Sequence, residues 1–355
     1  MHELKNIYQN KKILVTGHTG FKGSWLCVWL KMMGAQIKGY ALEPENPSLY
    51  KLIEKDLQID SYIGDIRNRE LFKQEILNFQ PDLIFHLAAQ PLVLASYEQP
   101  IETFDTNVMG TVHLLDAVRF LEKPCAVVCI TTDKVYENNE WIYPYRETDH
   151  LGGHDPYSSS KAACEIIIQS YRRSFFNLEH YNRHHKAIAS ARAGNVIGGG
   201  DFAVNRIVPD LLKALANNEP LQVRNPEAVR PWQHVLEPLG GYLLLGQKLY
   251  THPTEFAEAY NFGPWSQDNL PVEALIKLLI ASWGSGDYHT PENPNKLHEA
   301  GLLKLDISKS VNKLNWQPKL NISTTVDMIV DWTKNYTHQN PFELCKKQVE
   351  GYVNN

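Results

Sequence analysis

The sequence predicts an α/β fold: a doubly wound parallel sheet with a smaller, mixed α/β lobe. In the first half of the 355-residue chain, short apolar runs alternate with amphipathic stretches. Such alternation is typical of a parallel sheet with helices on both faces. A glycine-rich turn joins the first apolar run to the first helical stretch, as in nucleotide-binding sheets of this type. Together these features predict a Rossmann-like arrangement.

The predicted elements follow one another in strand–helix order. Each strand is a short run of β-branched and apolar residues, and each helix repeats apolar residues every three or four positions. The predicted strands are Lys12–Thr16, Gln36–Tyr40, Gln58–Ile63, Leu83–Leu87, Val127–Thr131 and Ala187–Arg192. The predicted helices between them are Lys22–Met33, Arg69–Asn78, Thr106–Leu121 and Tyr157–Phe176.

The pattern changes after Asn195, where three glycines at 198–200 precede segments broken by Pro and Asn. We therefore expect residues 1–195 to form the dinucleotide-binding domain. Residues 196–231 and 263–355 are expected to form the smaller, substrate-binding lobe. The segment 232–262 is apolar and helical again, and we expect it to return to the first domain.

Composition excludes several classes of partner. The formal net charge of −5 gives no general attraction to nucleic acid or to an anionic membrane surface. No apolar run is long enough to cross a bilayer, and the N-terminus lacks the layout of a secretory signal. The five cysteines are odd in number and scattered, which favours reduced core residues in a cytoplasmic protein. The histidines and cysteines show no metal-ligand spacing, so no metal is expected.

The first glycine-rich turn is the leading candidate for a dinucleotide site. It reads Gly-x-x-Gly-x-x-Gly directly after the first predicted strand, so the backbone can approach a pyrophosphate at a helix N-terminus. A plain strand-to-helix turn is the alternative. The candidate cofactor-binding residues here are Gly17, His18, Gly20, Phe21 and Gly23.

Two further strand ends fit the same ligand. Asp65 and Ile66 follow the third predicted strand, and Ala88, Ala89 and Gln90 follow the fourth, where small residues leave room for a ligand. Asp65 as a helix cap is the alternative. Glu43 follows the second strand and no arginine stands nearby to prefer a 2′-phosphate, which favours NAD over NADP.

The catalytic candidates are Thr132, Asp133, Lys134, Tyr157 and Lys161. Tyr157 and Lys161 lie four apart, on one face of a predicted helix. An ammonium beside a phenol favours its anion, so we expect Lys161 to lower the pKa of Tyr157 and to make it a general base for an alcohol. A core tyrosine with a solvated lysine is the alternative, and Asp133 is a turn former in that reading.

The glycine spacing, the Thr at the fifth strand end and the Tyr-x-x-x-Lys motif together resemble the extended short-chain dehydrogenase/reductase family. Within it, Thr132-Asp133-Lys134, the Ala191–Asp201 run and Arg230-Pro231-Trp232-Gln233-His234 are similar to sugar-nucleotide 4,6-dehydratases, and among these to the group that acts on CDP-glucose. The resemblance implies NAD as cofactor, CDP-glucose as small-molecule substrate, a homodimer or homotetramer, and a place in deoxyhexose synthesis for surface polysaccharide.

The resemblance also implies roles for single residues. Tyr157 takes the proton of the sugar 4-hydroxyl, with Thr132 bonded to the same oxygen and Lys161 on the cofactor ribose. Asp133 protonates the leaving 6-hydroxyl, while Lys134 either removes the C5 proton or stabilises the enolate. Local cations must hold the substrate pyrophosphate; the candidates are Asn195, Arg206, Arg230 and His234, with solvated surface arginines as the alternative.

Other functions stay open on the sequence alone. A dehydratase for GDP-mannose or a UDP-sugar, or a 4-epimerase, would share most of these residues. A dinucleotide-binding regulatory subunit on the same fold is the alternative from outside enzymology.

Overall fold

The computed structural model describes residues 2–291 and 301–354, and its centre is a parallel sheet. The sheet has seven strands in the order β11-β6-β5-β4-β1-β2-β3. The strands are β1 (Lys12–Thr16), β2 (Gln36–Ala41), β3 (Asp60–Ile63), β4 (Leu83–His86), β5 (Cys125–Ile130), β6 (Lys186–Ala193) and β11 (Ala259–Phe262). The predicted α/β class with a Rossmann-like sheet is confirmed.

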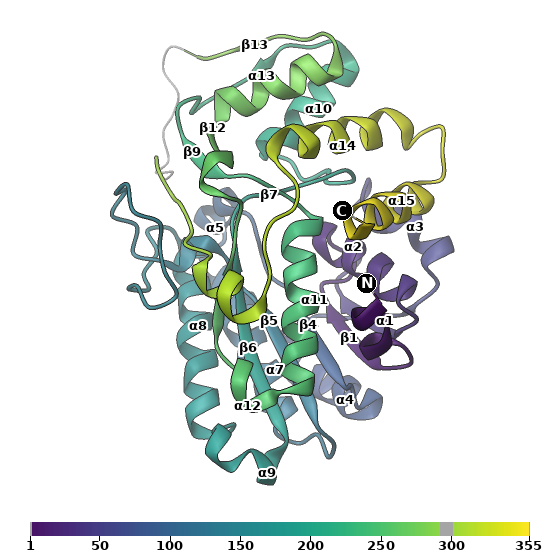
Figure 1. Ribbon diagram of the computed structural model, residues 1–355, viewed down its shortest axis with the longest axis vertical. Coiled ribbons are helices and arrows are strands. Elements are labelled where there is room, and N and C mark those ends of the chain that lie inside the picture. The colour runs from purple at the N-terminus through teal and green to yellow at the C-terminus, as the bar shows by residue number, and fades with distance from the viewer. Residues whose placement is uncertain (1, 292–300, 355) are drawn as a thin grey trace.

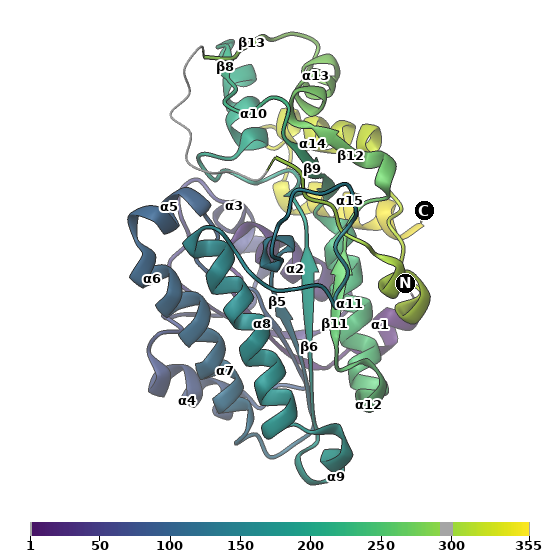
Figure 2. The same cartoon turned by 90° about the vertical axis from the view of Figure 1, so that its left-hand side faces the viewer.

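Helices cover both faces of this sheet (Figure 2). One face carries α2 (Phe21–Met32), α3 (Leu49–Leu57) and α11 (Leu236–Thr251), with α1 (His2–Tyr8) and α15 (Pro341–Asn354) beside them. The other face carries α4 (Arg69–Phe79), α7 (Gly110–Val118) and α8 (Pro156–Ser174). Successive β5 residues point to opposite faces, so Val128 belongs to one core and Val127 and Cys129 to the other.

The smaller lobe lies beyond the carboxyl ends of the strands (Figure 1). Its helices α10 (Ile207–Asn217), α13 (Val272–Trp283) and α14 (Ile322–Asn335) enclose a separate core around Leu211, Leu275 and Ile329. Its strand pairs are β7 (Val196–Ile197) with β10 (Gln233–His234), β9 (Val229–Pro231) with β12 (Asn269–Pro271), and β8 (Leu221–Gln222) with β13 (Tyr288–His289). The domain boundaries expected from the sequence stay a prediction; the contacts place α15 against α2 and α3 of the sheet layer.

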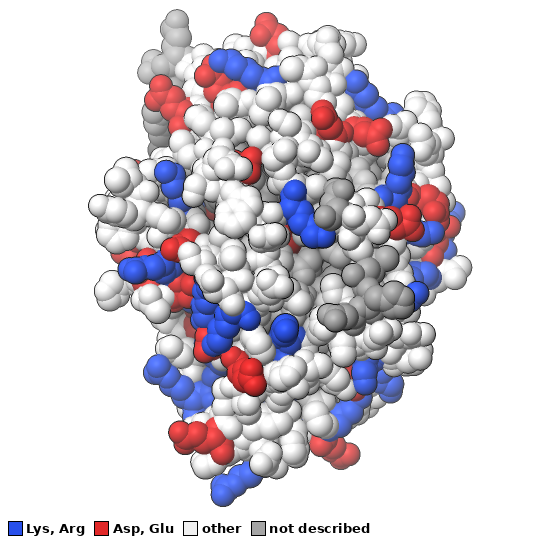
Figure 3. Space-filling view, viewed as in Figure 1, with Lys and Arg blue, Asp and Glu red and all other residues white. Residues whose placement is uncertain are grey.

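Short helices complete the chain. They are α5 (Val93–Glu98), α6 (Pro100–Phe104), α9 (Tyr181–His184) and α12 (Pro253–Phe256), with 3-10 turns η2 (Asp133–Val135), η3 (Leu178–His180) and η4 (Ser266–Asp268) and π-helical turns η1 (Asp105–Met109) and η5 (Ser310–Leu314). In the described ranges, every helix is too short or too polar to cross a bilayer. On the face drawn in Figure 3, acidic and basic side chains are interspersed.

Some elements differ from expectation. The predicted strand Gln58–Ile63 begins only at Asp60, because Gln58 has a left-handed φ of 44° and ends α3. The predicted helix Thr106–Leu121 begins as the π-helical turn η1 and continues as α7. The seventh strand, β11, was not predicted: its polar Asn261 breaks the apolar run and donates to the Tyr145 and Asp306 carbonyls.

Candidate active site

A large cavity opens between the carboxyl ends of the strands and the smaller lobe. Its volume is about 1380 Å³, larger than the roughly 300–1,000 Å³ of a pocket for one drug-sized ligand. The sheet side contributes the glycine turn after β1 and the ends of β4 and β5, and the lobe contributes residues around α10. The cavity therefore has room for a dinucleotide and a second ligand.

The glycine turn is shaped for close approach of a ligand. Gly17 has a left-handed φ of +74°, and a Cβ there would come within 2.8 Å of the Ala88 backbone nitrogen. A Cβ on Gly23 would collide with the Gly17 carbonyl oxygen. Gly20 caps α2 without a side-chain hydrogen bond, and the first turn of α2 contains no acidic residue. The first amides of α2 and its positive dipole end are thus left for an anion, which fits a dinucleotide pyrophosphate.

Most of the other predicted cofactor residues line the cavity. Gly17, Gly20, Phe21 and Gly23 do so at the turn, and Asp65, Ile66, Ala88 and Ala89 do so at the strand ends. The Asp65 carboxylate accepts hydrogen bonds from Arg67, with Oδ2 2.6 Å from Nη2. Burial raises the pKa of Asp65, but the bonds from Arg67 outweigh burial and lower it. Asp65 is therefore a charged, fixed group at the edge of the cavity.

Three predicted cofactor residues, His18, Gln90 and Lys161, are absent from the cavity wall, and their contacts with a cofactor stay a prediction. His18 is fully buried: its Nε2 is 2.7 Å from the Ser61 hydroxyl and its ring lies edge-on to Tyr50. Burial lowers the pKa of His18 to about 4. Gln90 instead braces its own loop, because its amide nitrogen donates to the Leu92 carbonyl at 3.1 Å. Both side chains therefore have partners within the protein.

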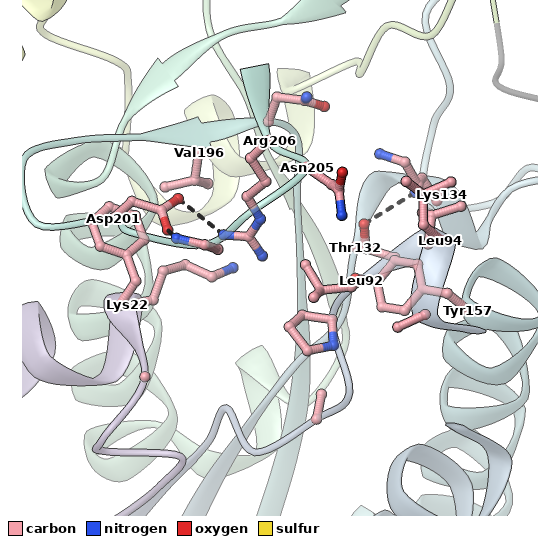
Figure 4. A pocket seen from close by; sticks show the side chains of 18 of the residues that line it. Lys22, Leu92, Leu94, Thr132, Lys134, Tyr157, Val196, Asp201, Asn205 and Arg206 are labelled. Carbon is pink, nitrogen blue, oxygen red and sulfur yellow. Dashed lines mark hydrogen bonds and ion pairs between the residues drawn. The ribbon is translucent and has the colours of Figure 1, made fainter. Parts of the chain in front are cut away.

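The catalytic candidates on α8 and β5 lie at one end of the cavity (Figure 4). Asp155 caps α8 by accepting the Ser158 amide at 2.9 Å, which places Tyr157 in the first turn. Tyr157 and Thr132 are both buried and line the cavity. Lys161 lies one turn further along, behind the cavity wall, and its ammonium donates to the Ile130 carbonyl at 3.2 Å.

The protein's own groups shift the pKa of Tyr157 upwards, against the expectation from its Lys161 neighbour. Burial raises it to about 12, and a hydrogen bond with Thr132 acts in the opposite direction. Burial also lowers the pKa of Lys161. The Lys161 ammonium donates to the Ile130 carbonyl at the end of β5.

Asp133 and Lys134 occupy the turn that follows Thr132. The Thr132 hydroxyl donates to Asp133 Oδ1 at 2.9 Å, and Lys134 Nζ lies 3.7 Å from the same oxygen. Asp133 is almost fully buried, and its second oxygen, Oδ2, has no partner among the described residues. A buried carboxylate oxygen without a partner is unusual in folded proteins. It fits a group that exchanges a proton with a ligand.

The predicted substrate residues divide into two sets. Asn195, Arg206 and Arg230 line the cavity from the lobe side, and Asn195 Oδ1 is buried without a partner among the described residues. Arg206 is held by Asp201 at 3.0 Å. His234 is fully buried against Trp25 and is absent from the cavity wall, so its contact with substrate stays a prediction.

A buried polar network supports the catalytic end of β5. Glu165, on α8, accepts hydrogen bonds from the Thr131 hydroxyl at 2.6 Å, the Ser190 hydroxyl at 2.8 Å and Arg192 Nη2 at 2.8 Å. Arg192 also donates to the Tyr136 hydroxyl at 2.9 Å. Because Thr131 precedes Thr132, this network connects the catalytic strand end to α8 and β6.

The sequence reasoning missed several charged residues of the cavity, among them Lys22 and Asp201. Lys22 extends from the first turn of α2 into the cavity, and Asp201 pairs with Arg206. A lysine inside the glycine turn was the available signal for Lys22, because that turn was already expected to border a ligand.

Comparison with known proteins settles the family. Residues 14–329 match the family model described as GDP-mannose 4,6 dehydratase. The chain belongs to this dehydratase family. A family member of Salmonella typhimurium, a CDP-glucose 4,6-dehydratase, is 48% identical over 351 residues, which cover 98% of each chain. The resemblance to extended short-chain dehydrogenase/reductases is thereby confirmed.

More distant relatives of the dehydratase share its fold. A CDP-paratose 2-epimerase of Salmonella typhi is 26% identical over 91% of this chain and 99% of its own length. The structure of a dTDP-glucose 4,6-dehydratase from Bacillus anthracis in complex with NAD superposes with a TM-score of 0.74 at 23% identity, covering 94% of this chain and 99% of that one. A Thermus thermophilus UDP-glucose 4-epimerase complex with NAD gives 0.77 at 20% identity, covering 91% and 99%.

Proposed function

We propose that this dehydratase converts CDP-D-glucose to CDP-4-dehydro-6-deoxy-D-glucose and water, with NAD as cofactor. The 48% identity to a CDP-glucose 4,6-dehydratase over 98% of both chains carries the proposal. The cavity supports it, because a glycine turn for a dinucleotide and the side chains of Thr132, Asp133 and Tyr157 border the same space. The product would supply deoxyhexose synthesis for surface polysaccharide.

The residues present fit NAD. Gly17, Gly20 and Gly23 would hold its pyrophosphate at the start of α2, with Asp65 and Ala88 at the neighbouring strand ends. Bound there, NAD supplies the hydride acceptor for oxidation at C4 and the hydride donor for reduction at C6.

Tyr157 and Thr132 would carry out the proton transfer at C4. The Tyr157 phenolate removes the proton of the 4-hydroxyl, while the Thr132 hydroxyl donates a hydrogen bond to the same oxygen. Because burial raises the pKa of Tyr157 to about 12, ionisation requires positive charge. The charge of Arg206 acts in that direction, and a bound oxidised nicotinamide would add positive charge.

Asp133 and Lys134 would carry out the elimination. Once C4 is a ketone, the C5 proton is acidic and the 6-hydroxyl can leave as water. Asp133 is the proposed acid for that hydroxyl, since its partnerless Oδ2 is free to exchange a proton. Lys134, whose Nζ is 3.7 Å from Asp133 Oδ1, either removes the C5 proton in its neutral form or stabilises the enolate as a cation.

A substrate comparison tests the proposal. Purified protein with NAD is incubated separately with CDP-glucose, dTDP-glucose, UDP-glucose and GDP-mannose, and loss of water is followed by mass, with Tyr157→Phe as the matched control. We expect turnover of CDP-glucose only. Turnover of another sugar nucleotide would keep the mechanism and refute the substrate. A product of unchanged mass would indicate an epimerase, and no product from any of the four would favour a regulatory subunit.

We also propose a self-associating, cytoplasmic enzyme. Large apolar side chains stay exposed on three helical segments that contact one another, at Ile101 and Phe104 of α6, Met109 of η1 and Ile166 of α8, as expected for a surface that meets a second copy. All five cysteines are buried and free, which supports a reducing compartment.

A further inference from the structure

Lys22 and Arg206 approach the same part of the cavity from opposite walls. Lys22 extends from the first turn of α2 on the sheet side, and Arg206 precedes α10 on the lobe side. In Figure 4 both side chains extend into the same part of the cavity. Thr132, Lys134 and Tyr157 are drawn on the other side of it. Two cationic side chains therefore border this part of the cavity.

Only one of these cations is neutralised by the protein. Arg206 Nη1 lies 3.0 Å from Asp201 Oδ2. Among the described residues, no acceptor hydrogen-bonds or ion-pairs with the Lys22 ammonium. Burial and the charges of Lys161 and Arg206 lower the pKa of Lys22 to about 8, while Asp133 and Asp201 act in the opposite direction. A partly buried ammonium without a partner is costly unless a ligand supplies the counter-charge.

The position of Lys22 specifies the ligand chemistry. It lies in the glycine turn, beside the free amides at the start of α2, and opposite an arginine. Amides, an ammonium and a guanidinium on three sides suit the oxygens of a diphosphate. Both ligands expected in this cavity carry a diphosphate.

We propose that Lys22, together with Arg206, forms a diphosphate-binding site in which Lys22 supplies the charge that the protein leaves uncompensated. The inference rests on the proposed function for the identity of the two diphosphates, the dinucleotide and the sugar nucleotide. It adds a binding role for a side chain inside the glycine turn, where the backbone alone was expected to act.

Calorimetric titration of charcoal-treated protein tests this site without turnover. NAD and CDP are titrated separately into the wild type, Lys22→Met, Lys22→Arg and the matched control Lys213→Met, which removes an exposed lysine of α10 outside the cavity. Loss of one charged hydrogen bond predicts a Kd increase of roughly 10- to 100-fold for Lys22→Met. Lys22→Arg should retain most of the affinity, and Lys213→Met all of it.

The two titrations identify the source of the diphosphate. Weaker CDP binding assigns Lys22 to the sugar nucleotide, and weaker NAD binding assigns it to the dinucleotide. Kd values for both ligands within about twofold of wild type would overturn the site. Lys22→Met should also keep its unliganded Tm, because no described residue pairs with the Lys22 ammonium. A marked fall in the Tm of Lys22→Met, with no recovery of affinity in Lys22→Arg, would make Lys22 structural and overturn the site.

The outcome is separable from that of the proposed function. If wild type converts CDP-glucose but Lys22→Met binds both ligands normally, the site is wrong and the function stands. If Lys22→Met loses diphosphate affinity but wild type leaves CDP-glucose unchanged, the site stands and the function is wrong.

Discussion

Removing one partner of the buried ion pair between Glu165 and Arg192 is predicted to cause a large loss of folding stability. Their side chains are 1% and 4% exposed and 2.8 Å apart. Arg192→Met leaves the Glu165 charge with only the hydroxyls of Thr131 and Ser190. Removing one partner of a buried ion pair costs about 3–5 kcal/mol. With an unfolding entropy of roughly 0.75 kcal/mol/K for 355 residues, Tm should fall by about 4–7 °C.

A double-mutant cycle separates charge from packing. Glu165→Gln keeps an acceptor and a donor for Thr131 and Ser190 but removes the charge. Combined with Arg192→Met, it should restore part of the lost stability, because no unpaired charge remains. Thermal and urea unfolding of wild type, both single variants and the double variant provide the four free energies. A double variant that loses the sum of the two single losses would refute the reasoning.

The pH dependence of the same variants has a definite sign. Burial raises the pKa of Glu165, but the charge and hydrogen bonds of Arg192 and the bonds from Thr131 and Ser190 outweigh burial and lower it. In wild type this contribution is present above the unfolded pKa of about 4.3 and is lost as pH falls through the folded pKa. In Arg192→Met, burial instead dominates, so protonation relieves the unpaired charge. The stability deficit of the variant should shrink between pH 7 and 5.

Three predictions concern the reaction and the assembly. Tyr157→Phe should lower kcat by about 10²- to 10⁴-fold, since the general base is lost, with little change in Tm or in the Kd for NAD. Asp133→Asn should slow water loss by at least about 10²-fold while hydrogen–deuterium exchange at C5, followed by mass, continues. Ile166→Glu should lower the mass measured by light scattering, because it places a charge on the exposed apolar surface of α6, η1 and α8.

Each of these has a clear contrary result. Undiminished dehydration by Tyr157→Phe would remove its role as base. If Asp133→Asn abolished hydrogen–deuterium exchange at C5 as well as the release of water, Asp133 would act before the elimination. An Ile166→Glu protein of wild-type mass would place any subunit contact on another face.

Most of the sheet and much of the site were predictable, for a physical reason. Strands such as β1 and β5 are buried on both faces, so they appear as continuous apolar runs. Because parallel strands end at one edge, residues just after them converge, and Thr132, Asp65 and Ala88 all line one cavity. β11 was missed because the polar Asn261 interrupts its apolar pattern. Asn261 donates to the backbone carbonyls of Tyr145 and Asp306, which are distant in the sequence, so no local pattern predicts this contact.

The direction of a side chain was harder to predict than its place in the chain. His18 and His234 lie in motifs that border the cavity, yet both rings turn into the protein core, against Tyr50 and Trp25 respectively. The upward pKa shift of Tyr157 comes mainly from its burial, which the helical spacing to Lys161 does not reveal. Position in a motif determines where a Cα lies, whereas packing determines where its side chain points.

The C-terminal helix has a consequence for any shortened version of the enzyme. After passing through the lobe, the chain returns with α15, which packs on α2 and α3; Tyr352 lies edge-on to Trp29 and its hydroxyl donates to Glu237 of α11 at 2.8 Å. Deleting residues 341–355 would therefore uncover α2, the helix that begins at the glycine turn, and would remove from the lobe only the contact of α15 with α14, which includes the bond from Gln348 to the Met328 carbonyl among the described residues. Helix α15 thus holds α2 and the glycine turn in place from outside, and a protein without it should lose affinity for the dinucleotide before the lobe unfolds.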